Sequence, residues 1–378
     1  MATHRIAAAG RVTYLDYQAT TPLAPQVKAA MTPWLDQFAN PHSPSTDGRR
    51  AAAAIEVARA RIDDLFSARG QLSFTSGATE ALNWALKGVF ARSERRKLVT
   101  LATEHAAVLD TAEWLEGQGV EVVRLPVGPD GLIDVNRAEA AIDDRTALVA
   151  VMIVNNEIGV IQPVEEIASL AHLRSALFLC DAVQGFGRVS LPQSADFIAI
   201  SAHKIHGPKG IGALWVRDGI GLDPLLHGGV QEKGGRSGTL SPMLCAGFGE
   251  AAHLMRQLEQ DDAGHIARLW AAALAELGPD WTFNGSAEAR YHGNLNLRRD
   301  GLDAARLLAD CRDIAFSLGS ACASGSGRPS HVLRAIGLSD REARSSIRLG
   351  FGRYTTEKEL IVACSRLNES ADLQRFAA

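Results

Sequence analysis

Between Gln71 and Val216, short apolar, β-branched runs alternate with amphipathic stretches. The run Val149–Val154 is apolar at every position, which is typical of a strand covered on both faces. Stretches such as Ala78–Ser93, Val108–Gln118 and Val164–Ser175 have the helical period instead. This alternation predicts an α/β fold with a mostly parallel seven-stranded sheet wrapped by helices. The expected strands are Gln71–Phe74, Lys97–Leu101, Val120–Leu125, Ala147–Val154, Ala176–Cys180, Asp196–Ser201 and Ile211–Val216.

The pattern changes after the glycine-rich stretch Gly228–Gly238. A long helical segment is predicted over Pro242–Leu277, and sparser elements follow it. They are strands at Trp281–Asn284, Asn294–Arg298 and Ser346–Leu349, and helices at Asp303–Arg312, Ser330–Ile336 and Thr356–Asn368. A chain of 378 residues is also long for a single core. We therefore predict a large α/β domain over 14–240 and a smaller α+β domain over 241–378, with residues 1–13 as a candidate addition to the smaller one.

Composition and charge exclude several classes of function. The chain is 46% hydrophobic and 22% charged, and its net charge of -4 gives no reason to expect nucleic acid as the main ligand. Its apolar runs are too short to span a bilayer and its start lacks the layout of a secretory signal, so we expect a cytoplasmic protein without membrane contact. Five scattered cysteines, never spaced as CxxC, argue against a disulfide framework and against a thiolate zinc site.

Polar side chains follow several of the predicted strands. Because ligands of open α/β sheets collect beyond the carboxyl ends of the strands, these residues are the first candidates for a site. The turn Ser76–Thr79 opens a helix and offers free backbone N–H groups to an anion such as phosphate, although an ordinary helix cap explains it equally well. His105 follows the next strand, where a structural histidine is the alternative.

Two further strand ends carry stronger signals. The segment after Val154 holds two amides, Asn155 and Asn156, and a glutamate. Asp181 comes directly after a buried strand, and Gln184 follows three residues later. A carboxylate at that position is costly unless a cation meets it, and either a protonated pyridine nitrogen or an arginine would serve.

Lys204 stands between two histidines in a turn that follows the strand Asp196–Ser201. A lysine that carries an aldehyde cofactor needs a desolvated site, and Ser201 and His203 are candidate phosphate donors beside it. A surface lysine with a solvated amine is the alternative. A metal site at His203 and His206 is weaker, since no third ligand is near. Together these strand-end residues meet the needs of pyridoxal 5′-phosphate (PLP).

Two other residues are unusual for their surroundings. Cys322 lies in the Gly- and Ser-rich stretch Leu318–Ser330, which we expect to be mobile, and an exposed thiol on such an arm indicates a reactive role. Arg348 lies inside an apolar strand, where its guanidinium needs an anion. A substrate carboxylate and a structural acid both fit this need.

These residues belong to motifs that resemble the cysteine desulfurases of the NifS/IscS-like group, within the class V aminotransferases of PLP fold type I. The resemblance runs from Tyr14 to about Leu360. The motifs that carry it are YLDYQATTP, TSGATE, TEHAAVLD, VNNEIGVIQP, SAHKIHGPKGIGAL, RSGT and GSAC…PSHVLRAIGL…SSIRLGFGR.

The resemblance implies a role for each candidate residue and an activity, conversion of L-cysteine to L-alanine. Lys204 would carry PLP, Asp181 would pair with its ring nitrogen, and His105 would stack on the ring. Asn156 and Gln184 would lie near the ring hydroxyl and the substrate, and Arg348 would hold the cysteine carboxylate. Cys322 would accept the sulfur as a persulfide. The residues expected to hold the phosphate are Ala78, Thr79, Ser201, His203 and, from the other subunit of a homodimer, Thr239.

Some positions depart from the family pattern and leave the partner open. Ser45 and Asp47 stand where a histidine and an aromatic residue are usual, Val230 replaces a glycine, and the chain ends without the tail used in scaffold docking. The sulfur acceptor can be an iron–sulfur scaffold, a sulfur-transfer protein or a tRNA-thiolation enzyme. The alternatives to the desulfurase are a selenocysteine lyase, another class V PLP enzyme and a non-catalytic sulfur carrier.

Overall fold

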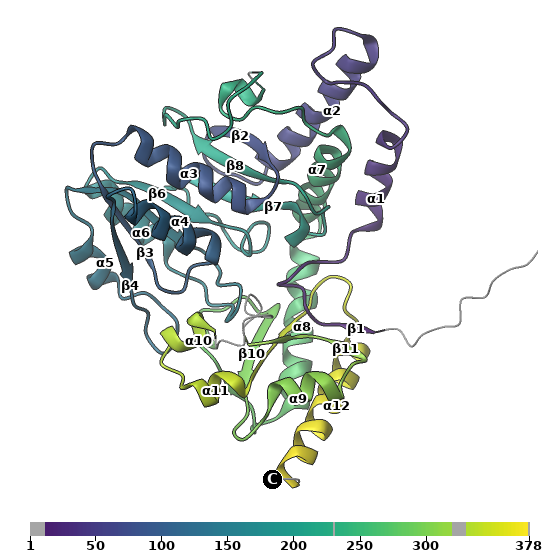
Figure 1. Cartoon of the computed structure of the whole chain (residues 1–378). Coiled ribbons are helices and arrows are strands. Elements are labelled where there is room, and N and C mark those ends of the chain that lie inside the picture. Colours follow the sequence, from purple (N-terminus) through teal and green to yellow (C-terminus); the bar gives the residue numbers. More distant parts are fainter. Residues whose placement is uncertain (1–11, 230, 320–329, 377–378) are drawn as a thin grey trace, which may run out of the picture.

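The computed structural model describes residues 12–229, 231–319 and 330–376. A seven-stranded sheet forms the centre of its upper part, in the order β2-β8-β7-β6-β5-β3-β4 (Figure 1). Strand β8 is antiparallel to both of its neighbours, and the other pairs are parallel. The predicted α/β fold with a mostly parallel seven-stranded sheet is confirmed. The strands are β2 (Gly70–Thr75), β3 (Lys97–Leu101), β4 (Glu121–Leu125), β5 (Thr146–Met152), β6 (Leu177–Asp181), β7 (Phe197–Ser201) and β8 (Gly212–Arg217).

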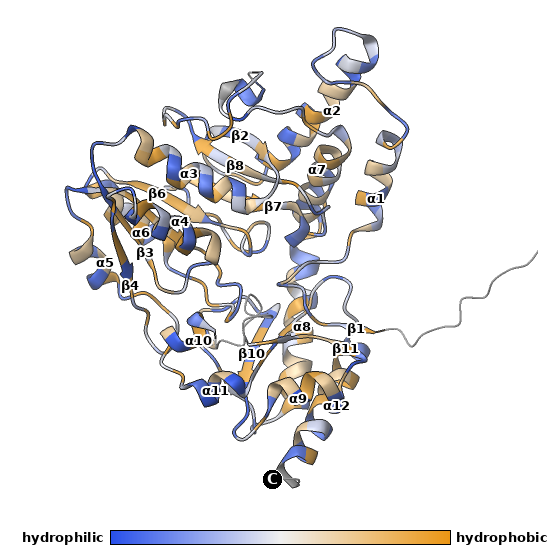
Figure 2. Ribbon diagram, in the orientation of Figure 1, coloured by the Kyte–Doolittle hydropathy of each residue, from blue (hydrophilic) through white to orange (hydrophobic). Residues whose placement is uncertain are grey.

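Both faces of the central part of this sheet are buried, and its central strands are mostly apolar. In β5, Leu148 and Ala150 face one hydrophobic cluster, and Val149 and Val151 face another. Helices α3 (Ala78–Arg92) and α4 (Ala106–Glu116) cover the first face. The helices on the second face are α2 (Thr46–Asp63), α5 (Val135–Ala141), α6 (Val164–Leu173) and α7 (Pro242–Gln257). The central strands are accordingly mostly hydrophobic, the edge strand β4 also carries hydrophilic residues, and hydrophilic residues lie along the outer sides of the helices (Figure 2).

A second core lies below the sheet in Figure 1. Its four-stranded antiparallel sheet has the order β12-β13-β10-β9, and a two-stranded parallel sheet joins β1 to β11. The strands are β1 (Thr13–Tyr14), β9 (Thr282–Phe283), β10 (Asn294–Arg298), β11 (Ile314–Ala315), β12 (Ser317–Leu318) and β13 (Ser346–Gly350). The helices that pack on this core are α8 (Glu259–Leu277), α9 (Ala304–Asp310) and α12 (Glu357–Phe376). Helices α10 (His331–Ala335) and α11 (Asp340–Arg344) pack on a smaller separate cluster.

The segment predicted as one long helix is two helices, because the chain leaves helical geometry at Leu258 (φ −106°, ψ 11°). Helix α7 packs on α2 and on α1 (Pro25–Met31) and buries Phe248 in the core of the large sheet. Helix α8 buries Leu269 in the second core. The division at residues 240 and 241 stays a prediction, and the two cores themselves separate between α7 and α8.

Short 3₁₀ turns complete the fold at Thr32–Trp34, Ala202–Lys204 and Glu232–Gly234. Within the part of the chain that the structure describes, none of the helices combines the length and the apolar character needed to cross a bilayer.

Candidate functional site

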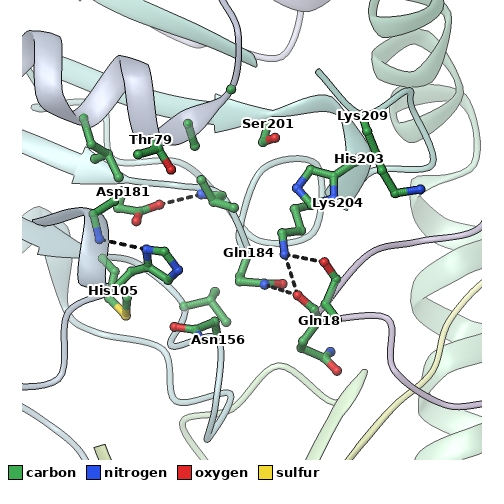
Figure 3. Close-up of a pocket in the computed structure, with 18 of the residues that line it drawn as sticks. Gln18, Thr79, His105, Asn156, Asp181, Gln184, Ser201, His203, Lys204 and Lys209 are labelled. Atoms are coloured by element: carbon green, nitrogen blue, oxygen red, sulfur yellow. Dashed lines mark hydrogen bonds between the residues drawn. The ribbon is translucent and has the colours of Figure 1, made fainter. Parts of the chain in front are cut away.

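The carboxyl ends of β5, β6 and β7 open into a cavity of about 480 Å³ (Figure 3). The start of α3, the start of α4 and the Gln18–Ala19 segment close its sides. Most of the residues predicted from the sequence line this one cavity. They are Ala78, Thr79, His105, Asn156, Asp181, Gln184, Ser201, His203, Lys204 and Arg348.

Lys204 ends the 3₁₀ turn that follows β7, and its half-buried side chain reaches into the cavity. Its Nζ donates hydrogen bonds to the backbone oxygens of Gln18 (2.6 Å) and Ala19 (2.9 Å). These oxygens fix the position of the amine. An amine held in this way lies where it can reach a ligand in the cavity. This position favours a cofactor-binding lysine over the alternative of a surface lysine with a solvated amine.

Asp181 is the last residue of β6 and is buried. Its Oδ1 accepts a hydrogen bond from the backbone N–H of Val183 (3.0 Å), and no salt bridge reaches it from any residue that the structure describes. Burial raises the pKa of its carboxyl, while Val183, His105 and Lys204 oppose the rise. A cationic ligand in the cavity would supply the missing countercharge.

His105 caps α4, and its Nδ1 accepts a hydrogen bond from the N–H of Ala107 (3.1 Å). An accepting Nδ1 carries no proton, so the proton of the neutral ring is on Nε2. Burial lowers the pKa of His105, Asp181 counteracts this effect and Lys204 adds to it. A neutral imidazole with a fixed tautomer is suited to packing against a flat ring.

The start of α3 presents unsatisfied backbone N–H groups to the cavity, because its N-cap Gly77 supplies no side-chain hydrogen bond. Gly77 packs closely on β8, where a Cβ on Gly212 would come within 2.7 Å of the carbonyl carbon of Gly77. The helix has 15 residues, so the positive end of its dipole adds to the attraction for an anion.

Two polar residues, one at the end of β7 and one just after it, line the cavity together with the start of α3. Ser201 is buried at the end of the strand, and His203 lies within hydrogen-bonding distance of Thr20, with 3.1 Å between Nδ1 and Oγ1. Burial, with the nearby charges of Lys204 and Lys209, lowers the pKa of His203 to about 4. The imidazole is therefore neutral near pH 7 and offers a hydrogen bond without a charge.

Asn156 and Gln184 connect the cavity to its surroundings. The backbone oxygen of Asn156 accepts a hydrogen bond from Nη1 of Arg348 (3.0 Å). Nε2 of Gln184 donates to the backbone oxygen of Gln18 (3.0 Å), which also receives Nζ of Lys204. Gln184 and Lys204 are thus tied to the same backbone oxygen.

Arg348 is only 1% exposed and has a structural acid as partner. Its Nη2 bonds Oδ1 of Asp16 (2.6 Å) and Oγ of Ser317 (3.1 Å). Its Nε is buried without a hydrogen-bond partner, and the residue lines the cavity. The alternative of a structural acid is therefore present in Asp16, and the binding of a substrate carboxylate stays a prediction.

The sequence interpretation missed Gln18, Ala19 and Asp16, which together position Lys204 and Arg348. The signal that could have found them is the group of polar residues that begins at Asp16, two residues beyond the end of the strand β1.

Other predicted residues lie elsewhere. Thr239 is exposed and does not line the cavity of its own chain. Cys322 and Val230 lie outside the described residues. Ser45 caps α2 by accepting a hydrogen bond from the N–H of Gly48 (3.0 Å), and Asp47 is the acid in the first turn of that helix, so both departures from the family pattern have a local structural role. In residues 12–229, 231–319 and 330–376, no three His, Cys, Asp or Glu side chains gather as metal ligands.

The chain is similar to known proteins over nearly its whole length. Residues 13–361 match the family described as aminotransferase class-V. The cysteine desulfurase IscS of Rickettsia bellii (strain OSU 85-389) is 44% identical, covering 95% of this chain and 92% of its own. The protein of the same name from Rickettsia typhi (strain ATCC VR-144 / Wilmington) is 43% identical, with 94% and 91% covered. Among solved structures, a NifS-like protein from Rickettsia africae ESF-5 has a TM-score of 0.87 at 29% identity, covering 96% of this chain and 100% of that one. A structure described as SspA in complex with cysteine has a TM-score of 0.82 at 36% identity, covering 91% and 100%.

Proposed function

The chain belongs to the aminotransferase class-V family of PLP-dependent enzymes, and from this premise we propose that it is a cysteine desulfurase that converts L-cysteine to L-alanine. One observation carries the proposal: a single cavity holds the amine of Lys204, the buried carboxylate of Asp181, the neutral ring of His105 and a buried arginine. Relatives more than 40% identical over most of the chain carry the name of this activity.

The residues of the cavity fit PLP. Asp181 is a buried acid without a salt bridge among the described residues, which suits a protonated ring nitrogen. The uncapped start of α3, at Ala78 and Thr79, suits the phosphate together with Ser201 and His203. When bound, PLP supplies an electron-withdrawing ring that weakens the bonds at the α-carbon of an amino acid. Lys204 Nζ is the amine in the cavity that would hold the aldehyde.

The remaining tasks belong to side chains of this protein. Nε of Arg348 is the buried donor left for the substrate carboxylate, while Asp16 and the backbone oxygen of Asn156 keep the guanidinium in place. Lys204 Nζ, when it is not bonded to the cofactor, would serve as the base that moves the proton of the α-carbon. Gln184 Nε2 donates to the same backbone oxygen of Gln18 as Lys204 Nζ does, which places the amide of Gln184 beside the amine.

We propose that Cys322 accepts the sulfur of the substrate, because it is the cysteine of the motif GSAC. Its thiolate Sγ attacks the sulfur of the substrate, so that an S–S bond forms while the carbon–sulfur bond breaks. The persulfide stays on Cys322, and the carbon takes up a proton to become the methyl group of alanine. A thiolate is required because the thiol is a poor nucleophile.

We also infer a homodimer in which Thr239 reaches the phosphate site of the partner subunit. Its exposure, and its distance from the cavity lining of its own chain, support this role. Light scattering should give the mass of two chains, and Thr239→Ala should weaken PLP binding. A fully active monomer would refute the inference.

The persulfide sulfur would pass to a protein acceptor, which we expect to be an iron–sulfur scaffold, a sulfur-transfer protein or a tRNA-thiolation enzyme. Cytoplasm is the expected compartment, and the four cysteines that the structure describes are buried free thiols, as suits a reducing environment. Copurification from the native host, followed by detection of persulfide on the captured protein, tests this step.

The activity itself is tested with the purified protein, PLP and L-cysteine in the presence of a thiol reductant. We expect equal amounts of alanine and sulfide, and none with Lys204→Ala. Borohydride reduction and peptide mapping should place PLP on the peptide that contains Lys204. A label on another lysine would contradict the assignment, and turnover of selenocysteine alone would favour a lyase.

A further inference from the structure

A second cavity, of about 260 Å³, lies where the two cores meet. Its walls come from the junction of α7 and α8, from the turn that follows β6 and from the segments before β10 and after β13. Figure 1 shows α8 passing from the level of the large sheet down to the smaller one. The second cavity shares no lining residue with the cavity of Lys204.

Arg353 is the charged group in this wall with an unsatisfied donor. Its Nε lies 3.0 Å from both carboxylate oxygens of Asp262, and its Nη2 lies 2.5 Å from Oδ2. The side chain is 9% exposed, and its Nη1 is buried with no hydrogen-bond partner. Burial lowers the pKa of Arg353, while Asp262 and the neighbouring Tyr354 raise it above its usual value, so Tyr354 lies close to this guanidinium. A buried guanidinium N–H without an acceptor is costly, and a ligand with an anionic oxygen would satisfy it.

Two more guanidinium groups line the cavity without a carboxylate partner among the described residues. Arg290 is buried and donates to backbone oxygens, such as that of Ser286 (2.7 Å), and burial lowers its pKa to about 9. Arg188 donates to the backbone oxygen of Gln184 (3.2 Å). Glu259, the other acid in the wall, is exposed to solvent, so water screens its charge. The buried part of the cavity therefore has an excess of positive charge.

Apolar side chains line another part of the wall, among them Ile161, Val189, Met255 and Ile266. The rings of Tyr17, His206, Tyr291 and His292 also line it. The volume is below that of sites for drug-sized molecules and suits a ligand of amino-acid size. We propose that this cavity binds a small organic carboxylate, with its anionic oxygen on Nη1 of Arg353 and its carbon chain against the apolar side.

Arg188 would connect such a ligand to Lys204 through its hydrogen bonds. It lines the second cavity, and its guanidinium donates to Oε1 of Gln184 (3.2 Å) and to the backbone oxygen of Lys204. A carboxylate beside Arg188 competes for these donors and so alters how Lys204 and Gln184 are held. The site is an effector site for the reaction, and only this last step rests on the proposed function.

Calorimetric titration of the PLP-loaded protein with sodium propionate tests the site, with inorganic phosphate at the same ionic strength as the comparison. Propionate should bind saturably, and phosphate should bind more weakly because it has no apolar part. Ala267→Leu fills the cavity from α8 and should weaken propionate binding at least tenfold. The matched control is Ala275→Leu, an exposed alanine two turns along the same helix and outside the cavity, which should leave binding unchanged.

A second variant replaces both partners of the ion pair between Arg353 and Asp262, so that no unpaired buried charge remains. Asp262→Asn together with Arg353→Gln should weaken propionate binding about ten- to a hundredfold, as expected for a lost charge-assisted hydrogen bond. Propionate held by Arg348 in the cavity of Lys204 would bind Ala267→Leu as well as it binds the wild type, and that result would overturn the proposal. So would the absence of saturable heat in the wild type.

The two proposals fail separately. Propionate binding without turnover of L-cysteine would leave the site intact and refute the desulfurase. Turnover of L-cysteine without propionate binding would support the desulfurase and refute the second site. Where both hold, the rate of alanine formation should change with propionate in the wild type and in Ala275→Leu, and not in Ala267→Leu.

Discussion

Replacing Asp181 by asparagine distinguishes two effects of its charge: it lowers the stability of the protein without PLP, and it supports the activity of the protein with PLP bound. Burial raises the pKa of this carboxyl in the folded chain. A carboxyl with a raised folded-state pKa destabilises the fold at pH values above its ordinary pKa near 4, and the penalty grows until the pH exceeds the folded-state value. Without PLP, Asp181→Asn should therefore be at least as stable as the wild type at pH 7, and its stability should fall less between pH 4 and pH 7.

With PLP bound, the same change should be severe. Asparagine keeps the hydrogen bond from Val183 and loses the negative charge that faces the ring nitrogen. Removing one partner of a buried charge pair costs about 3–5 kcal/mol. At about 1.4 kcal/mol for each factor of ten, kcat/KM for alanine formation should fall by roughly two to four powers of ten. The PLP-dependent rise in melting temperature should shrink as well.

The matched control is Asp196, another buried acid, which accepts a hydrogen bond from Phe178 (2.8 Å) and lies outside the cavity. Asp196→Asn should change stability by a similar amount with and without PLP and leave kcat/KM within a few-fold of the wild type. An Asp181→Asn protein that kept kcat/KM within tenfold would refute the pairing of Asp181 with the cofactor.

Three further outcomes are expected. Cys322→Ser should bind PLP and L-cysteine normally but form alanine at least about 10³-fold more slowly, because serine takes no sulfur; undiminished alanine release would show that Cys322 is structural. Arg348→Lys should raise KM about ten- to a hundredfold, the value of a charge-assisted hydrogen bond, with a smaller effect on kcat, and an unchanged KM would remove Arg348 from substrate binding. Burial lowers the pKa of His206 from 6.5 to about 3, so protonation of the unfolded chain should lower the free energy of unfolding of the wild type by about 3 kcal/mol more between pH 6.5 and pH 4 than that of His206→Asn. Asparagine tolerates the positive φ of 68° at this position. Equal losses in urea titrations of the two proteins would contradict this.

The sequence predicted the sheet well because its strands are buried on both faces. Val149 and Val151 pack on one side, Leu148 and Ala150 on the other, and no partner far along the chain is needed to recognise such a run. Most of the predicted site residues follow the ends of these strands, whereas Arg348 lies inside a strand of the smaller sheet, and ten of them line one cavity.

Other features depend on contacts between distant parts of the chain. The pairing of Arg348 with Asp16 joins positions 332 residues apart, and the hold of Gln18 on Lys204 spans 186. The break at Leu258 was missed because the apolar period continues from α7 into α8 while the two helices pack on different cores. Periodicity reports which face of a helix is buried, and it does not report which core buries it.

The first segment after residue 12 has a mechanical consequence. Leu15 lies in the core of the smaller sheet, and β1 pairs with β11, while Gln18 and Ala19 hold the amine of Lys204 and Thr21 bonds the backbone of His203 (2.9 Å). About six residues of chain thus join both cores. Neither core can unfold without disturbing the segment that holds Lys204, so the two should melt in one cooperative transition. A single proteolytic cut between Asp16 and Pro22 should split that transition into two.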